Sequence, residues 1–305
     1  MQNRIEWLDS ARGIAILMVI YSHLVFRNQL LGAYFSPITL TTFFFVSGYL
    51  FDSSRSFLET VEQRFRTLMI PWFIYGLFII FLSQIATFKQ HDSLAVELMG
   101  MFTAIRGKHD ALWFLACLFV SSVPFYVFIK NIPKNYLFII SLIFLIINRV
   151  LVTGPIPWYI HFVAPAMFYM TLGYLFKQYE YRFNFLNSSR ILFVLIPLYI
   201  LEVSLYYNFN GKSVSFQSTP YIVDGIVITI TGLLLFISIS KKLSFFKSLL
   251  VFIGSNSLLY FCLHGKILSL LEKLCHLANS HFINYSQSTF FMFALGILVA
   301  ISTAL

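Results

Sequence analysis

Long runs of apolar residues recur along the whole 305-residue chain and leave little polar sequence between them. A membrane-spanning helix needs about 20 mostly apolar residues, and about ten segments of the chain come close to this requirement. They are residues 11–30, 38–52, 67–87, 111–129, 135–152, 158–176, 191–208, 221–239, 250–270 and 288–305. A chain inside a bilayer must pair its own backbone hydrogen-bonding groups, so each segment is expected to be an α-helix. The sequence therefore predicts an all-α, polytopic membrane protein.

The composition agrees with this fold class and excludes a sizeable soluble domain. Charged residues make up 11% of the chain, against about 25% in soluble domains, and 59% of the residues are hydrophobic. We therefore expect one transmembrane domain over residues 1–305, with membrane lipid as its main surroundings. No basic module with interleaved aromatic residues is present, so no nucleic-acid partner is expected. The oligomeric state cannot be read from the sequence.

The distribution of basic residues predicts the orientation of the chain. Counted across the ten segments, thirteen of the 21 Lys and Arg residues fall on the side of the N-terminus and eight on the other side. Because cytoplasmic loops carry an excess of Lys and Arg, both termini are expected in the cytoplasm. The first apolar segment lacks a small-residue cleavage site, so it is not expected to be a removable signal peptide. The net charge of +9 is attributed to this topology and to attraction toward anionic lipid or an anionic ligand.

Ionisable side chains lie within the first apolar segment, LDSARGIAILMVIYSHL, which runs from Leu8 to Leu24. Arg12 and His23 are eleven residues apart, which places them on one helix face about 16 Å apart along the axis. Asp9 is spaced for an ion pair with Arg12. Ionisable groups are costly in a bilayer, which favours a functional role for this face, with His23 near the middle of the membrane. The alternative is that Asp9 and Arg12 are interfacial anchors and His23 is a hydrogen-bonded packing residue.

The cysteines give no sign of a metal site. Cys117, Cys262 and Cys275 show no paired spacing, and we expect them to pack as small apolar groups rather than to bind metal.

Four further stretches follow the first segment in order: TFFFVSGYLF (42–51), QRFRTLMIPW (63–72), LWFLACLF (112–119) and FIGSNSLLYFCLHGKI (252–267). Together with the Arg12–His23 spacing, this ordered set resembles the acyltransferase-3 family of integral-membrane O-acyltransferases. The closest resemblance is to the branch that modifies bacterial surface sugars. One position departs from the family pattern of two arginines three residues apart: Arg64 matches the first, but Thr67 occupies the second, with Arg66 beside it.

The resemblance implies transfer of an acetyl group from acetyl-CoA to a sugar hydroxyl of a bacterial surface glycan or its lipid-linked precursor. It also implies a multi-pass protein of the bacterial inner membrane. Arg12, Arg64 and Arg66 are then expected to bind the anionic donor at the cytoplasmic face, because Arg suits phosphate geometry. His23, acting with Arg12, is the expected catalytic group, either as a general base or through a covalent acyl-histidine.

Other residues in the matching stretches have two interpretations each. Ser47 lies in the second-helix motif, where we expect it to let helices approach closely. Trp113 is either an aromatic anchor at the membrane interface or a surface for sugar stacking. His264 is expected at a depth similar to that of His23, and it is either a second polar group in the central cavity or an outer-leaflet histidine bonded to a backbone carbonyl. Asp9 is expected to support Arg12.

A transporter or glycolipid flippase is the alternative class of protein. Many transporters are built from two repeated halves with broken helices at matching positions. Pro124, Pro165 and Pro197 lie in predicted helices, but no matching pair of halves is evident. The sequence favours the acyltransferase.

Overall fold

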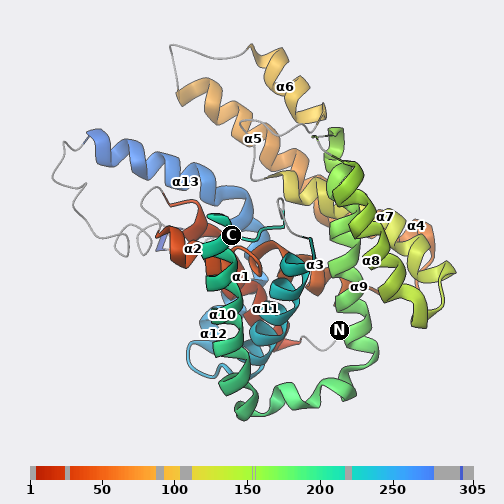
Figure 1. The fold of residues 1–305 in the computed structure, drawn as a ribbon. Coiled ribbons are helices and arrows are strands. Elements are labelled where there is room, and N and C mark those ends of the chain that lie inside the picture. The colour runs from red at the N-terminus through yellow and green to blue at the C-terminus, as the bar shows by residue number, and fades with distance from the viewer. Residues whose placement is uncertain are drawn as a thin grey trace. The chain divides into compact units, whose positions relative to one another are not determined.

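Every regular element in the described part of the protein is a helix. The structure is a computed structural model that describes residues 5–24, 28–86, 93–103, 112–152, 154, 156–216, 222–277 and 296–297. Within these ranges every regular element is a helix and no strand occurs, as Figure 1 shows. The predicted all-α fold class is confirmed.

Two compact units divide the chain, and each is described by itself. The first unit combines Met1–Val46 with Tyr179–Leu305, and the second is Ser47–Gln178, so one boundary falls inside helix α3. A single domain over residues 1–305 stays a prediction.

The first unit contains most of the N-terminal and C-terminal helices. They are α1 (Glu6–Ser22), α2 (Gln29–Phe35), most of α3 (Thr39–Tyr49), η4 (Glu180–Asn187), η5 (Ser189–Ile191), α10 (Leu192–Asn210), α11 (Ile222–Lys242), α12 (Lys247–Ser255) and α13 (Ser257–Leu277). The second unit holds α4 (Phe57–Arg64), the π-helix η1 (Phe65–Met69), α5 (Ile70–Ala86), α6 (Leu94–Thr103), α7 (Trp113–Asn131), α8 (Lys134–Leu151), η3 (Pro157–Phe162) and α9 (Val163–Gln178).

Seven helical stretches in the described part of the chain are long and apolar enough to cross a membrane, and a bent pair raises the number to eight. The seven are Gln29–Tyr49, Phe57–Phe81, Trp113–Asn131, Lys134–Leu151, Pro157–Gln178, Ser189–Asn210 and Ile222–Lys242. Each of them overlaps one of the predicted segments, and the chain is a polytopic membrane protein.

The remaining three predicted segments have different outcomes. The segment 11–30 is not one continuous helix, because α1 has 17 residues and ends at Ser22. The segment 250–270 forms the bent pair, with an angle of 81° between its two helices. The segment 288–305 lies almost wholly outside the described residues.

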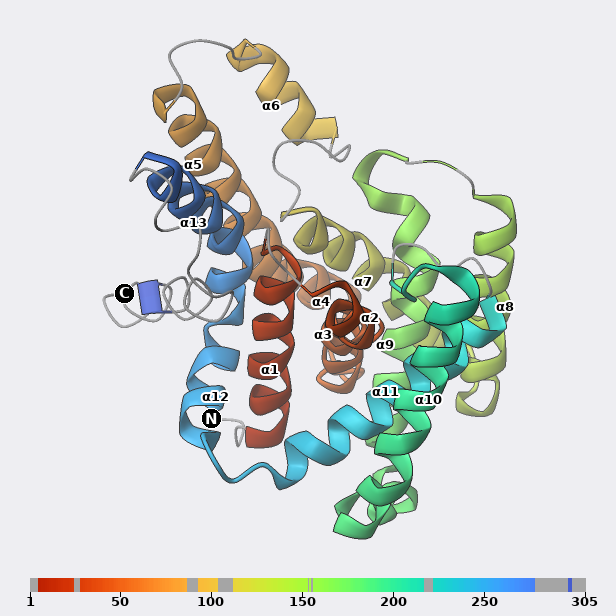
Figure 2. The ribbon, with the colours of Figure 1, turned by 60° about the vertical axis from the view of Figure 1, so that its left-hand side comes forward.

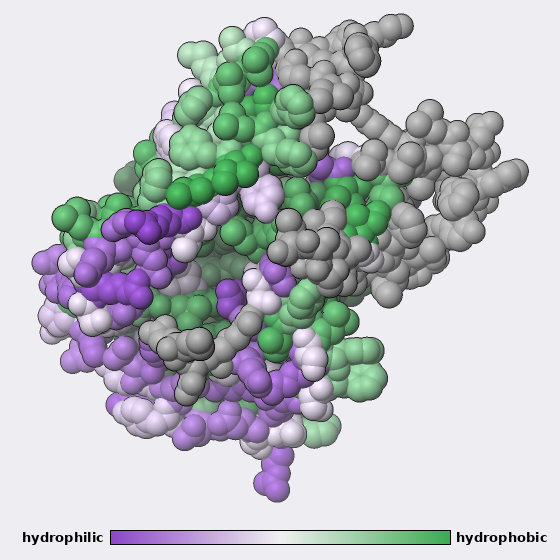
Figure 3. Space-filling model, turned by 180° about the vertical axis from the view of Figure 1, so that it is seen from behind, coloured by the Kyte–Doolittle hydropathy of each residue, from purple (hydrophilic) through white to green (hydrophobic). Residues whose placement is uncertain are grey.

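The surface is that of a protein surrounded by lipid. Large apolar side chains such as Phe193, Leu151 and Phe81 are mostly exposed, at 83%, 72% and 62%. Figure 3 shows broad green areas of hydrophobic residues on the visible face. A soluble monomer rarely exposes apolar area of this extent to water, whereas lipid tails solvate it.

Helices α1 and α12 pack with their backbones almost in contact, and they run side by side in Figure 2. Two glycines allow this approach. A Cβ atom on Gly254 would lie 2.7 Å from the carbonyl carbon of Asp9 and 2.9 Å from the nitrogen of Gly13. A Cβ on Gly13 would clash with the carbonyl oxygen of Leu250. Small residues serve the same purpose wherever membrane helices pack closely.

A sharp bend separates α12 from α13 at Asn256. The Asn256 side-chain amide donates to the carbonyl of Phe252 at 2.9 Å, and the Ser255 hydroxyl donates to the same carbonyl at 2.7 Å. Ser and Asn compete in this way with the backbone bonds of a continuing helix. The bend lets α12 follow α1 closely while α13 leaves at a different angle and still contacts α1.

The second unit has its own close helix contact at the end of α3. A Cβ on Gly48 would lie 2.5 Å from the carbonyl carbon of Met170 in α9, so only glycine fits there. This contact gives the Ser-Gly-aromatic motif around Gly48 a packing role.

The glycine contact between α1 and α12 leads to a stability prediction. Gly254→Ala places a methyl group against backbone atoms that cannot rotate away, so we expect about 1–3 kcal/mol of destabilisation from overpacking. Thermal unfolding of the purified protein in detergent measures this effect. Gly32→Ala in α2 is the matched control, since a Cβ there meets nothing within 4 Å. Equal unfolding temperatures for the two variants would contradict the described packing.

Candidate functional site

His23 lies at the C-terminal end of α1 rather than deep inside a helix. It is the residue that caps α1, and its side chain is exposed. The prediction of a buried histidine in the middle of a long segment is therefore wrong in this respect, because the helix ends one residue earlier, at Ser22. A histidine at a helix end is open to a substrate, which a fully packed one is not.

The hydrogen bond of His23 determines which ring nitrogen is available. Its Nδ1 lies 2.8 Å from the carbonyl oxygen of Val19, one turn earlier in α1. A carbonyl oxygen only accepts, so Nδ1 carries the proton in the neutral ring and donates it to this bond. The lone pair of the neutral imidazole is then on Nε2. This is the arrangement that a general base or a nucleophilic imidazole needs.

His264, in α13, lies beside His23. The centroids of the two imidazole rings are 4.8 Å apart, and the ring planes make an angle of 71°. His264 is 1% exposed, and its Nδ1 donates to the carbonyl of Phe261 at 2.8 Å. Its Nε2 is buried and has no hydrogen-bond partner among the described residues. His264 therefore bonds to a backbone carbonyl and also lies against the ring of His23.

The two histidines meet because α13 packs against the end of α1. A small apolar cluster fixes this contact, consisting of Leu24 after α1 and of Leu268 and Leu271 in α13. Tyr21 packs on the same cluster from α1. The bend at Asn256 then brings α13 past the exposed ring of His23.

The ion pair predicted near the start of α1 is present. Arg12 donates from Nη2 to Oδ1 of Asp9, and Asp9 is 1% exposed. Arg12 keeps 29% of its side chain exposed, whereas its Nε is buried without a hydrogen-bond partner among the described residues. Ile16 and Val19, which lie on the Arg12–His23 face between these two residues, are both buried.

Arg64 and Arg66 belong to the second unit, where they differ clearly. Arg64 is half-buried, and its Nη2 lies 3.4 Å from the carbonyl oxygen of Ser47 at the end of α3. Arg66 is exposed and pairs with Glu62 at 2.5 Å, one turn away on the surface. Since the pair Arg66–Glu62 is exposed, its attraction is weak. The guanidinium that faces the protein interior is therefore that of Arg64.

A π-helix begins immediately after Arg64. It covers Phe65–Met69, the same residues in which the sequence departs from the two-arginine pattern. Wider turns of this kind occur mostly as single insertions in α-helices, frequently at functional sites. Thr67, which occupies the second arginine position of the pattern, lies in this π-helix and donates its hydroxyl to the backbone carbonyl of Gln63.

The other two residues from the matching stretches are buried in the second unit. Ser47 is 7% exposed, and its hydroxyl has no partner among the described residues. Trp113 is 5% exposed and packs against Tyr159 and Phe162, with ring centroids 5.6 and 5.2 Å away. This packing leaves Trp113 little surface for an exposed membrane anchor or for a sugar.

The structure thus brings some of the predicted site residues together and leaves others apart. His23 and His264 form a pair, and Asp9 and Arg12 form another pair at the opposite end of α1. Ser47, Arg64, Arg66 and Trp113 lie in the second unit, which is described separately. Glu202, in the membrane-spanning stretch Ser189–Asn210, belongs to none of the sequence motifs, although a carboxyl in such a stretch is itself a signal of function.

These features define a polytopic, all-α membrane protein with a histidine pair at the end of its first helix. The family model described as an acyltransferase domain matches residues 5–305. The chain belongs to this family, acyltransferase-3, and is a membrane acyltransferase. Comparison with curated proteins gave no match, and neither did comparison with solved structures.

Proposed function

We propose that this acyltransferase moves an acetyl group from acetyl-CoA to a hydroxyl of a bacterial surface glycan or of its lipid-linked precursor. The observation that carries the proposal is the His23–His264 pair, in which an exposed imidazole with its lone pair on Nε2 lies against a buried imidazole. Membership of an acyltransferase family does not favour transport, the alternative function.

The chemistry requires only a base beside the acceptor. Nε2 of His23 takes the proton of the sugar hydroxyl while the hydroxyl oxygen attacks the thioester carbonyl carbon. The carbon–sulfur bond then breaks, and the proton passes to the CoA sulfur as the thiol leaves. In the covalent version Nε2 itself attacks the thioester, and the acetyl-imidazole is transferred to the hydroxyl in a second step. His264 supports either version by positioning the ring of His23.

The charges of the first unit support a cytoplasmic N-terminus in the inner membrane. Lys241 pairs with Glu180 at 2.8 Å and lies 5.1 Å from the ring centre of Trp7, and Lys247 pairs with Glu6. The start of α1, the end of α11 and the start of α12 therefore meet at one basic end of the unit. The positive-inside rule assigns this end to the cytoplasm, where acetyl-CoA is found.

In this orientation the two ends of α1 have different roles, one in binding the donor and the other in catalysis. Arg12 lies toward the basic end, where it can contact the phosphates of CoA, and Asp9 holds its guanidinium in place. His23 lies about 16 Å further along the axis. An acetyl group carried on the long pantetheine arm has to cover that distance, and the buried side chains of Ile16 and Val19 must move to open a path along this face.

The first prediction from this proposal concerns His23. His23→Gln keeps hydrogen-bonding capacity but removes both the base and the nucleophile, so acetyl transfer should fall by about 10² to 10⁴. Mass spectrometry of the acetylated glycan gives the readout, with membrane extraction as the control for expression. His161→Gln, a histidine in the second unit that accepts a hydrogen bond from Ile156, is the matched control. Near-normal acetylation by His23→Gln would leave His23 as a packing residue.

The second prediction separates the two neighbouring arginines. Arg64→Ala should raise the KM for acetyl-CoA about tenfold or more, because it removes a charge-assisted contact with the donor. Arg66→Ala should change that KM little, since Arg66 is exposed and pairs with Glu62. Steady-state kinetics of the purified protein with varied acetyl-CoA decide between them. A larger effect from Arg66→Ala would reverse the assignment.

A further inference from the structure

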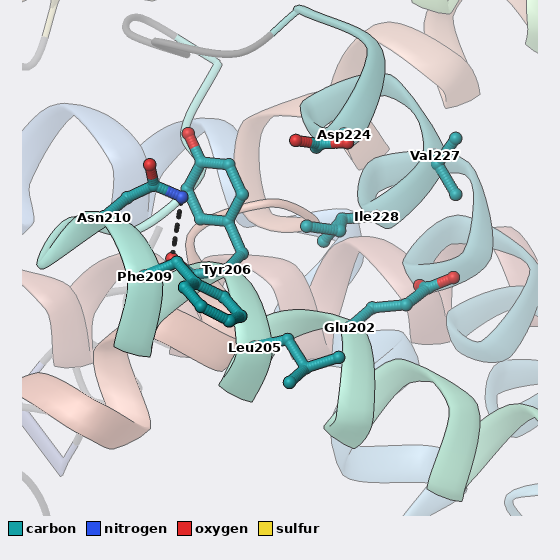
Figure 4. Close-up of a pocket in the computed structure, with 8 residues that line it drawn as sticks. All are labelled: Glu202, Leu205, Tyr206, Phe209, Asn210, Asp224, Val227 and Ile228. Carbon is teal, nitrogen blue, oxygen red and sulfur yellow. Dashed lines mark hydrogen bonds between the residues drawn. The ribbon is translucent and has the colours of Figure 1, made fainter.

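A groove between α10 and α11 lies in the first unit, and its lining includes neither the two histidines nor the Asp9–Arg12 pair. Its volume is about 600 Å³, within the range of small-molecule sites. Figure 4 shows the side chains around it: Glu202, Leu205, Tyr206, Phe209, Asn210, Asp224, Val227 and Ile228. Two carboxyl groups are thus present, and neither Lys nor Arg is among the lining residues.

Glu202 is a half-buried carboxyl of the groove and lies within the membrane-spanning stretch Ser189–Asn210. Its Oε1 accepts a hydrogen bond from the Thr231 hydroxyl at 3.3 Å. Its Oε2 is buried and has no partner among the described residues. A buried carboxyl oxygen without a donor is costly, so a ligand that supplies a hydroxyl or N–H donor would be stabilised there.

The spacing of the two carboxyl groups excludes a single bound ion as their shared ligand. Thr231 lies opposite Glu202, and Asp224 is seven residues before Thr231 in α11, which is about 10 Å along the axis. Metal–oxygen distances are about 2.0–2.6 Å, so one cation cannot contact both groups. A ligand that bonds to both has to be about as long as one or two sugar rings and to carry donors at both ends.

The walls of the groove suit a ligand with apolar as well as polar faces. Tyr206 and Ile228 form a buried floor, whereas Phe209 is 83% exposed at the rim. Sugar rings combine hydroxyl edges with apolar C–H faces that pack on such side chains. The amide of Asn210, which donates to the Tyr206 carbonyl at 2.9 Å, adds a further polar group at the mouth.

The groove continues into an apolar stripe along α10. Leu198, Leu201 and Leu205 follow helical spacing on one face and are 41%, 55% and 47% exposed. This stripe gives a path for a hydrocarbon tail next to a head group held in the groove. Asp224 and Asn210 lie at the ends of α11 and α10 opposite to the basic cluster around Lys241.

We propose that this groove binds the saccharide head group of a membrane glycolipid, with the hydroxyls donating to Glu202 and Asp224 and the tail following α10. Its identification as the acceptor subsite rests on the proposed function, but the binding itself does not. The groove lies at the end of the first unit that is opposite its basic end. His23, at the C-terminal end of α1, lies toward the same end of the unit as the groove.

A photolabelling experiment tests the proposal without any need for acetyl transfer. The probe is a dodecyl maltoside with a photoreactive diazirine in the alkyl chain next to the sugar, added to the full chain in lipid nanodiscs. We expect labelled peptides from residues 194–228, and excess free maltose should compete. Glu202→Gln combined with Asp224→Asn should lower this labelling about tenfold, the loss of a charge-assisted hydrogen bond.

Matched controls decide the outcome. Glu62→Gln removes an exposed carboxyl group in the second unit and should leave the labelling unchanged. A probe with the same chain and diazirine but a trimethylammonium head should label the groove weakly. The proposal is overturned if the double variant labels as wild type, or if the cationic probe labels residues 194–228 as strongly as the maltoside. Since labelling is independent of turnover, an inactive His23→Gln and an unlabelled groove are separate results.

Discussion

The close contact between α1 and α12 is the constraint on which the rest of the first unit depends. Gly13 and Gly254 let the two backbones meet, and no side chain fits between them. Because α12 is held against α1, the bend at Asn256 determines where α13 goes. That direction places His264 against His23 at the end of α1. The two glycines therefore determine how the two histidines are positioned.

In the histidine pair, the ring of His23 is exposed and yet held in one orientation. His23 is open at the helix end, yet its ring is oriented by the Val19 carbonyl and by the buried ring of His264. A base at an exposed position without such contacts would sample several rotamers, and each would have to be fixed again in the transition state. Holding the ring in advance removes part of that cost. The carbonyl bonds on both Nδ1 atoms leave the two Nε2 atoms as the groups without protons in the neutral pair.

Much of the fold and part of the candidate site can be predicted from the sequence, and the features that cannot be predicted have physical causes. Apolar runs predict the helices because a bilayer admits no other backbone arrangement for these segments, and the Asp9–Arg12 spacing predicts their ion pair. The sequence does not predict the end of α1 at Ser22, because apolar residues continue past it to Leu31, interrupted by His23, Arg27, Asn28 and Gln29. Arg64 and Arg66 are two residues apart and so lie on nearly opposite faces of a helix, but which of them faces inward depends on tertiary packing. The His23–His264 contact joins residues 241 positions apart, so only tertiary packing reveals it.

The central claim is that His23 and His264 act as one unit in acetyl transfer. The most direct test is the rate of transfer from labelled acetyl-CoA for wild type, His23→Gln, His264→Gln and the double variant. If the two rings act together, the double variant is no slower than His23→Gln alone, since groups that work as a unit have non-additive effects. Losses that multiply in the double variant would show that the two histidines act independently and would contradict the account.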